Sequence, residues 1–293
     1  SVKTMKNCTP LTESGFDNAT TTSDLWFVAD TSFECDSAFS VLGTVNLILC
    51  DDVTVTLKKG IALSAGVGQH VTLNIYRQEQ GTGRLNVTGE ANYGYAAIRN
   101  NIHSDATATL NIYGGIISAV GSPRLGAPGV PDSYGAGIGT SIIASKGAMN
   151  VNISGGTVTA KSGEGAQAIG NGTGGTSTVT VKISDGMKCV KTDDPNTKYA
   201  YDNTDGTSIT ITKCENHKWK YSQTASNPED NHTKTCSLCS TKIEESHNQT
   251  NWVLDEKDKG YHTSTCACGA IGQASHQITW VLHDDGLTHT KKC

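Results

Sequence analysis

The chain has 293 residues with a net charge of −5, and an acidic balance argues against nucleic acid as a partner because phosphates require a basic surface. Glycine is abundant (32 residues) and proline scarce (6), which favours β-strands joined by tight turns over helices. No run of about 18 apolar residues occurs, so we expect no membrane insertion.

Residues 1–50 are predicted to form an N-terminal cap and the first coil of a stacked β-structure. The segment Val45–Leu57 begins with a continuous apolar run, as a strand buried on both faces would. We expect Trp26 and Phe27 to cover the open end of the stack, since an uncovered end exposes a sheet edge. The first residues lack the apolar core of a signal peptide, which fits a mature secreted protein or an internal fragment.

Residues 51–213 repeat one unit: a strand, a turn, a second strand, a turn, and a short strand of small residues. Anchoring the copies on Ile75, Ile112, Ile153 and Ile183 gives intervals of 37, 41 and 30 residues. Such a unit cannot bury its own apolar face, so it stacks on the next. The constant order within each unit predicts an all-β fold, a right-handed parallel β-helix, with an antiparallel sandwich as the alternative.

The apolar residues of these strands are predicted to point inward. They are Leu73, Ile75, Leu85, Val87, Ile98, Leu110, Ile112, Ile117, Ile138, Val151, Ile153, Val158, Ile169, Val179, Val181 and Ile183.

The segments "VNLILCDDVTVTLKKGIALSAG", "LNIYRQEQGTGRLNV" and "ISGGTVTAKSGEGAQAIGNG" resemble a family of large surface proteins of Gram-positive gut bacteria. The resemblance covers about residues 24–190. It implies a right-handed β-helix in a secreted or cell-surface protein, of the kind described as adhesin-like or carbohydrate-binding. It implies no catalytic residue.

A glycan or a host surface protein is the partner that this resemblance implies, and the sequence gives no oligomeric state. Tyr76 and Tyr113 are among the aromatic residues that could stack on sugars, and the insertion Pro123–Ser133 is a candidate contact loop. The candidate binding residues are Tyr93, Tyr95, Arg99, Arg124 and Tyr134.

A polysaccharide lyase or glycoside hydrolase is the enzymatic alternative, and a non-binding structural spacer is the third. Hydrolysis needs carboxylates a fixed distance apart. The carboxylates of the coils fall in turns, and we expect Asp51 and Asp52 to cap a turn, so we expect no enzyme.

An acidic segment, Lys191–Gly206, could bind calcium, although a polar hairpin that closes the last coil is the simpler interpretation. Its carboxylates are Asp193, Asp194, Asp202 and Asp205. Five scattered cysteines hint at an oxidising compartment, and their pairing is left open. They are Cys8, Cys35, Cys50, Cys189 and Cys214.

Residues 214–293 contain two and a half small modules, each reading His, Trp strand, polar turn and His-x-x-x-Cys strand. The third ends at Cys293, so we expect the natural chain to continue. A module of some thirty residues cannot build a real core and needs a metal or a disulfide staple, with Trp219, Trp252 and Trp280 as its apolar cover.

Two histidines and two cysteines match the ligand count of a structural zinc site. The candidate ligands are His217, His232, Cys236 and Cys239 in the first module, His247, His262, Cys266 and Cys268 in the second, and His276, His289 and Cys293 in the third. A grouping with the downstream histidine, His247 or His276, is the alternative. Zinc is favoured over disulfides because disulfides leave the recurring histidines unexplained.

Overall fold

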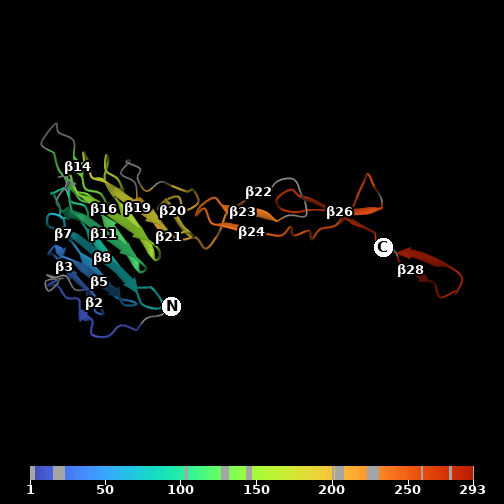
Figure 1. Cartoon of the computed structure of the whole chain (residues 1–293), viewed down its shortest axis with the longest axis horizontal. Helices are drawn as coiled ribbons and strands as arrows, with labels where there is room; N and C mark the ends of the chain where they lie inside the picture. Colours follow the sequence, from blue (N-terminus) through green and yellow to red (C-terminus); the bar gives the residue numbers. More distant parts are fainter. Residues whose placement is uncertain are drawn as a thin grey trace. The chain divides into compact units, whose positions relative to one another are not determined.

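The computed structural model describes residues 4–15, 24–102, 105–126, 132–142, 147–199, 201, 208–222, 231–258, 260–276 and 279–292. The chain divides into two compact units, Ser1–Asn216 and His217–Cys293. Regular structure in the described ranges consists of β-strands (Figure 1). Within those ranges, no helix is long and apolar enough to cross a membrane.

Three sheets build the first unit. The first contains β1 (Thr9–Pro10), β2 (Leu25–Ala29), β5 (Thr44–Leu49), β8 (His70–Arg77), β11 (Thr107–Ile112), β16 (Ala148–Ile153) and β19 (Val179–Ile183). The second contains β3 (Phe33–Cys35), β6 (Thr54–Leu57), β9 (Arg84–Thr88), β12 (Ile116–Val120), β17 (Thr157–Lys161), β21 (Ser208–Lys213) and β20 (Met187–Lys191). The third contains β4 (Phe39–Val41), β7 (Ile61–Ala65), β10 (Ile98–Ile102), β15 (Ile138–Gly139) and β18 (Ile169–Gly170). A separate pair, β13 (Pro123–Arg124) and β14 (Ser133–Tyr134), is antiparallel.

From β5 to β19 the chain visits the first, second and third sheets in turn, and its strands pair in parallel with those of the next coil. This stacking of parallel sheets is compatible with a parallel β-helix. The four anchor residues of the predicted repeat are register partners, because Ile75 pairs with Ile112, Ile112 with Ile153, and Ile153 with Ile183. The repeat seen in the sequence is therefore the repeat that stacks.

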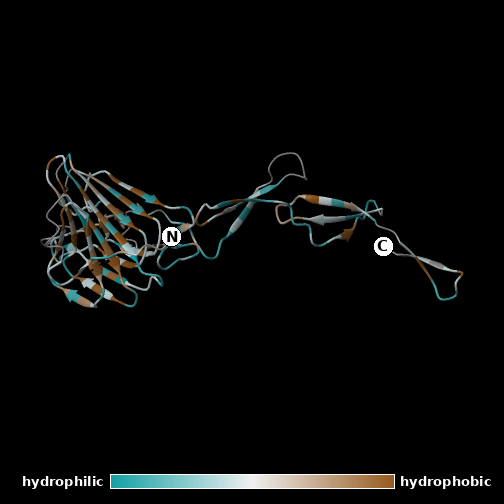
Figure 2. Cartoon of the chain, turned by 60° about the horizontal axis from the view of Figure 1, so that its bottom comes forward, coloured by the Kyte–Doolittle hydropathy of each residue, from teal (hydrophilic) through white to brown (hydrophobic). Residues whose placement is uncertain are grey.

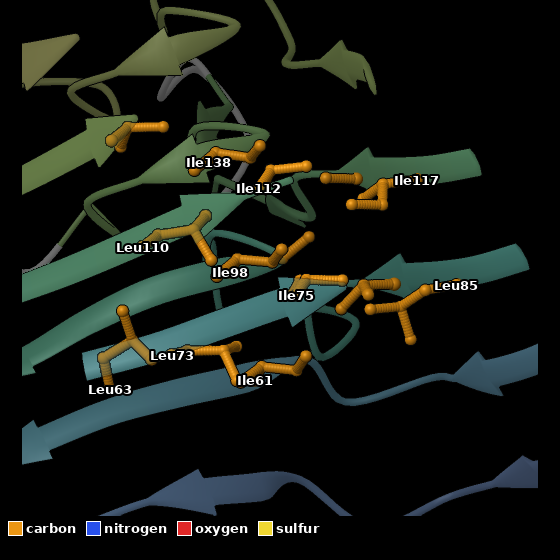
Figure 3. Close-up of a cluster of buried hydrophobic side chains, with 14 of the residues drawn as sticks. Ile61, Leu63, Leu73, Ile75, Leu85, Ile98, Leu110, Ile112, Ile117 and Ile138 are labelled. Carbon is orange, nitrogen blue, oxygen red and sulfur yellow. The ribbon is translucent and has the colours of Figure 1, made fainter. Parts of the chain in front are cut away.

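The interior between the three sheets is filled by the alternate apolar residues of each strand. Figure 3 shows Leu73, Ile75, Leu110 and Ile112 among the labelled side chains of this buried cluster. Along these strands hydrophobic and hydrophilic residues alternate in Figure 2. The predicted inward residues are confirmed as buried up to Ile169, whereas those of β19 are only partly buried. β19 is the last strand of its sheet, so one side of it has no neighbouring coil to cover it.

Two glycines show why this residue is needed where neighbouring coils approach closely: Gly135, before the short strand β15, and Gly156, in the turn between β16 and β17. A Cβ at Gly135 would lie 2.2 Å from the carbonyl carbon of Tyr95 on the preceding coil. Two conditions require glycine at position 156: its φ is +77°, and a Cβ there would lie 2.4 Å from the Gly115 oxygen. Only glycine satisfies both conditions at low cost.

The parallel stack ends with antiparallel strands: β21 pairs antiparallel with both β17 and β20. The acidic segment that was predicted as a closing hairpin lies between β20 and β21 in the sequence. Asp202 and Asp205 lie outside the described residues, so the calcium hypothesis stays a prediction.

At the other end, Phe27 is buried in the core as part of β2. Trp26 instead stacks on Tyr76 with ring centroids 5.3 Å apart. In the sheet, β5 lies between β2 and β8, so Trp26 reaches across β5 to this ring, and its end-covering role stays a prediction.

The second unit consists of small antiparallel sheets. They are β22 (Trp219–Ser222), β23 (His232–Cys236) and β24 (Lys242–Glu245); β25 (Val253–Leu254), β26 (Tyr261–Thr265) and β27 (Ile271–Ser275); and β28 (Thr279–Leu282) with β29 (His289–Lys292). Of the three tryptophans predicted as an apolar cover, Trp219 is half-buried and stacks on His217 with ring centroids 4.6 Å apart, whereas Trp252 and Trp280 are 40% and 66% exposed.

Buried side chains are scarce in the described part of this unit. They are His232, Cys236, Leu238, Cys239, Ser264, Cys266 and Ala270, and four of the seven are candidate metal ligands. An apolar core of this size cannot hold the unit together.

Candidate metal centres and binding face

A first group of ligand atoms gathers around His217, Cys236 and Cys239, and Cys214, three residues before His217, offers the fourth. All four ligand atoms lie within 4.8 Å of one another. The Cys239 Sγ is 3.3 Å from the His217 Nδ1. Ligands on a tetrahedral zinc ion lie about 3.3–3.8 Å apart, so this group could hold a metal ion.

A tight turn places Cys236 and Cys239, two of the three thiols of the first group. The backbone N–H of Cys236 donates to the Thr241 oxygen at 2.9 Å, and the N–H of Ser240 donates to the Cys236 oxygen at 2.9 Å. The turn requires a left-handed residue, which is Ser240 with φ 61°.

The second module repeats this turn in a shorter form. There the N–H of Cys266 donates to Ala270 O and that of Gly269 to Cys266 O, both at 2.8 Å. Gly269 takes the left-handed position with φ 90°. The equivalence explains why Cys-x-x-Cys in one module and Cys-x-Cys in the other serve the same purpose.

The environment favours the thiolate form that a metal needs. Burial raises the pKa of the Cys236 thiol, but hydrogen bonds from the backbone amides of Cys239 and Leu238 and from His217 outweigh burial and bring it to about 6. The pKa of Cys266 is also about 6, where burial is outweighed by the backbone amide of Cys268 and by His247. Thiolates are the metal-binding form of cysteine.

The second group consists of His232, His247, Cys266 and Cys268, again with all ligand atoms within 4.8 Å. The two Nδ1 atoms lie 3.2 Å apart. The Cys268 Sγ is 3.2 Å from the His247 Nδ1, and the Cys266 Sγ is 3.8 Å from the His232 Nδ1. These separations match the edges of a tetrahedral site.

Glu245 orients one of these ligands. Its Oε1 lies 3.1 Å from the Nε2 of His232, on the side of the ring away from the ligand cluster, and its Oε2 accepts from Lys234 at 2.5 Å. The hydrogen bond from Lys234 is the main reason why the pKa of Glu245 lies below its ordinary value, and His232 adds to it. A carboxylate behind a ligating histidine fixes the ring and its tautomer.

The ligand groups in the structure differ from the sequence-based grouping at three residues: His232 lies in the second group and not the first, His262 lies in neither, and Cys214 is added to the first. His232 and Cys236 are the two ends of β23. A strand rises about 3.3 Å per residue, so side chains four residues apart lie about 13 Å apart and cannot share one metal. The same reasoning separates His262, on β26, from Cys266.

Cys214 was missed as a ligand because it was counted with the scattered cysteines of the coils. The signal was its distance from His217, since short Cys-x-x-His spacings are typical of metal ligand pairs. His262 and His276 lie together, with ring centroids 4.3 Å apart, but outside both groups. The side chain of His289 and all of Cys293 lie outside the described residues.

The nine described cysteines form no disulfide. The scattered Cys35, Cys50 and Cys189 are buried in the first unit.

The candidate binding residues of the coils lie around one corner. Tyr93 and Tyr95 stack with ring centroids 5.4 Å apart, and the Arg99 guanidinium lies 4.8 Å from the Tyr95 ring centroid. Arg99 also donates to the Lys59 oxygen at 3.0 Å, so it holds the corner together. Arg124 and Tyr134 sit on the paired strands β13 and β14.

A second aromatic feature lies on the outer face of the first sheet. Trp26, Tyr76 and Tyr113 form a continuous stack, with 5.3 Å and 4.8 Å between successive ring centroids. Tyr113 is 45% exposed. On the next coil the residue that corresponds to Tyr113 is the small Ser154, since Ile112 pairs with Ile153. No further ring therefore covers Tyr113, and the stack ends with an open ring face.

A row of asparagines runs beside this aromatic stack. Asn74 donates to Asn46 at 2.8 Å, Asn111 to Asn74 at 2.7 Å, and Asn152 to Asn111 at 2.8 Å. Each amide retains further hydrogen-bonding capacity after these bonds. The face therefore combines flat rings with amide groups.

Comparisons of the chain with protein-family models, with curated proteins and with solved structures gave no match. The candidate sites therefore rest on the residues and their geometry.

Proposed function

We propose that this chain is an adhesin-like protein of the bacterial cell surface. In this proposal a right-handed parallel β-helix binds a glycan or a host surface protein, and hairpin modules stapled by zinc serve as a spacer. The observation that carries the binding part is the aromatic stack of Trp26, Tyr76 and the exposed Tyr113 beside the asparagine row.

Glycan recognition requires a flat apolar surface for the sugar ring together with hydrogen-bonding groups for its hydroxyls. An exposed aromatic ring supplies the first, and neighbouring amides supply the second. The open face of Tyr113 is the natural stacking position, because Ser154 leaves room beside it.

The experiment is a glycan-array screen of the full chain, followed by Tyr113→Ala and Tyr113→Phe on any glycan that binds. Tyr113→Ala should weaken binding about tenfold, the value of one aromatic stacking contact, whereas Tyr113→Phe keeps the ring and should preserve binding.

Tyr93→Ala is the control, because it removes a similarly exposed ring at the other candidate corner, and it should have no effect on binding. The opposite pattern would move the site to that corner. No binding to any glycan or host surface protein would contradict the adhesin and leave the structural spacer.

Zinc is the metal that the ligand chemistry favours. Thiolates and imidazoles suit zinc, whereas calcium and magnesium select oxygen ligands. Four protein ligands leave no position for a reactive water, so the role is structural. His232 comes from the first small sheet of the second unit, while Cys266 and Cys268 follow β26 of the next. One ion would thereby join two consecutive modules.

Metal analysis of the purified chain together with a free-thiol count tests this part. We expect bound zinc, with the thiols of the ligand cysteines becoming reactive only after chelation, whereas Cys8, which lies outside both groups, reacts before it. Absence of metal together with oxidised cysteines would establish disulfide staples instead.

A further inference from the structure

The arrangement of ligands in the second group implies a rule for the whole repeat. That group takes one histidine from the end of the preceding module, His232, and the histidine that opens its own module, His247. The two are linked by strand pairing, because His232 is the register partner of Glu245, and Glu245-Ser246-His247 leads to the second ligand.

The same arrangement occurs once more along the chain. His262 is the register partner of Ala274, and Ala274-Ser275-His276 leads to the next histidine. The His262 and His276 rings have centroids 4.3 Å apart, compared with 5.0 Å for His232 and His247. The close approach of two imidazole rings is thus repeated one module later, although the rings meet at 73° there and at 39° in the first pair.

An independent observation points to a ligand at this pair. The Nε2 of His276 is buried and has no hydrogen-bond partner among the described residues. A buried ring nitrogen without a partner is costly, and a metal ion would satisfy it.

We propose that His262 and His276 form half of a third metal centre, which rests on the metal stapling proposed above. Sequence supplies the next ligand: His289-Thr-Lys-Lys-Cys293 repeats His262-Thr-Ser-Thr-Cys266, so Cys293 corresponds to the ligand Cys266. With two imidazoles and one thiolate, the centre takes a zinc-like divalent ion, with a solvent molecule or another ligand in the fourth position.

The test is a cobalt titration of the reduced, metal-stripped full chain, followed by absorption, with zinc stoichiometry by native mass spectrometry. We expect three equivalents of metal to bind per chain. The third should bind most weakly and add the smallest thiolate-to-cobalt absorption, because it carries one thiolate. His276→Ala and Cys293→Ser should each reduce the stoichiometry from three to two and leave the absorption of the first two equivalents unchanged.

His283→Ala is the matched control, because His283 is an exposed histidine of the same module that belongs to neither group. It should keep three equivalents. Two equivalents in the unaltered chain, or three that survive both variants, would overturn the third centre while leaving the other two intact. Binding of no metal at all would instead overturn the stapling proposal itself.

Discussion

At the scale of single residues, Glu245 offers the sharpest test of the second centre. Glu245→Gln removes the carboxylate that holds the His232 ring, so the metal affinity of that centre should fall about 10–100-fold. Competition with a chromophoric chelator measures this affinity. Glu244→Gln changes the exposed neighbour on the same strand and should leave the affinity unaltered. Equal affinities for the two variants would mean that Glu245 does not act through His232.

The residue scale also shows where sequence reasoning succeeded and failed. Ligand types and the positions of Cys236, Cys239, Cys266 and Cys268 were predictable, because His and Cys recur at fixed places in the repeat. Their grouping was not, because His-x-x-x-Cys places two ligands near each other in a helix but at opposite ends of a strand such as β23.

At the scale of elements, the asparagine row should hold successive coils in register. Asn111 lies in the middle, where its side chain both donates to Asn74 and accepts from Asn152. Asn111→Ala should lower the free energy of unfolding of the first unit by about 1–3 kcal/mol, since it leaves two amide partners without their hydrogen bonds. Urea unfolding followed by circular dichroism measures this. Thr109→Ala, two residues earlier on the same outer face of β11, is the control, and an equal loss there would show that the row adds nothing.

The stability of the turn between β8 and β9 should depend on pH. Asp51 accepts backbone hydrogen bonds from Gln80, Gly81 and Thr82 at 3.0, 2.7 and 3.1 Å, which confirms its predicted role as a turn cap. Although the desolvation of Asp51 raises its pKa, these hydrogen bonds lower it below the ordinary value. The stabilisation from the ionised form is therefore present above about pH 4 and is lost as the pH falls through the folded-state pKa.

Asp51→Asn should consequently lower the melting temperature of the first unit at pH 7, and the difference from the unaltered chain should vanish in acid. Thermal melts across pH 2–7 measure it. Asp52→Asn, at the neighbouring position, is the control, because Asp52 accepts none of these three hydrogen bonds. A constant difference for Asp51→Asn at every pH would contradict the role of its charge.

At the scale of the whole molecule, the two units differ in how well the sequence predicts them. In the coils, apolar alternation and the Ile75, Ile112, Ile153 and Ile183 anchors determine both the buried face and the register, because a one-residue shift would expose the core. The aromatic stack was less visible, since Trp26 and Tyr76 lie 50 positions apart in the sequence and meet only through stacking. In the second unit hydrophobic patterning decides little, because most apolar residues there are exposed.

That difference leads to opposite responses to metal removal. Because the few buried residues of the second unit are mostly ligands, its folding free energy should come largely from metal binding, as in other small metal-stapled domains. Chelation should abolish hydrogen-exchange protection in β23 and β26 while leaving β8, β11 and β16, which surround an apolar core, fully protected. Mass-spectrometric hydrogen exchange on the full chain measures both regions in one sample. Protection of β23 and β26 that survives the chelator but disappears with a reductant would show that disulfides, and not metal ions, hold the modules together.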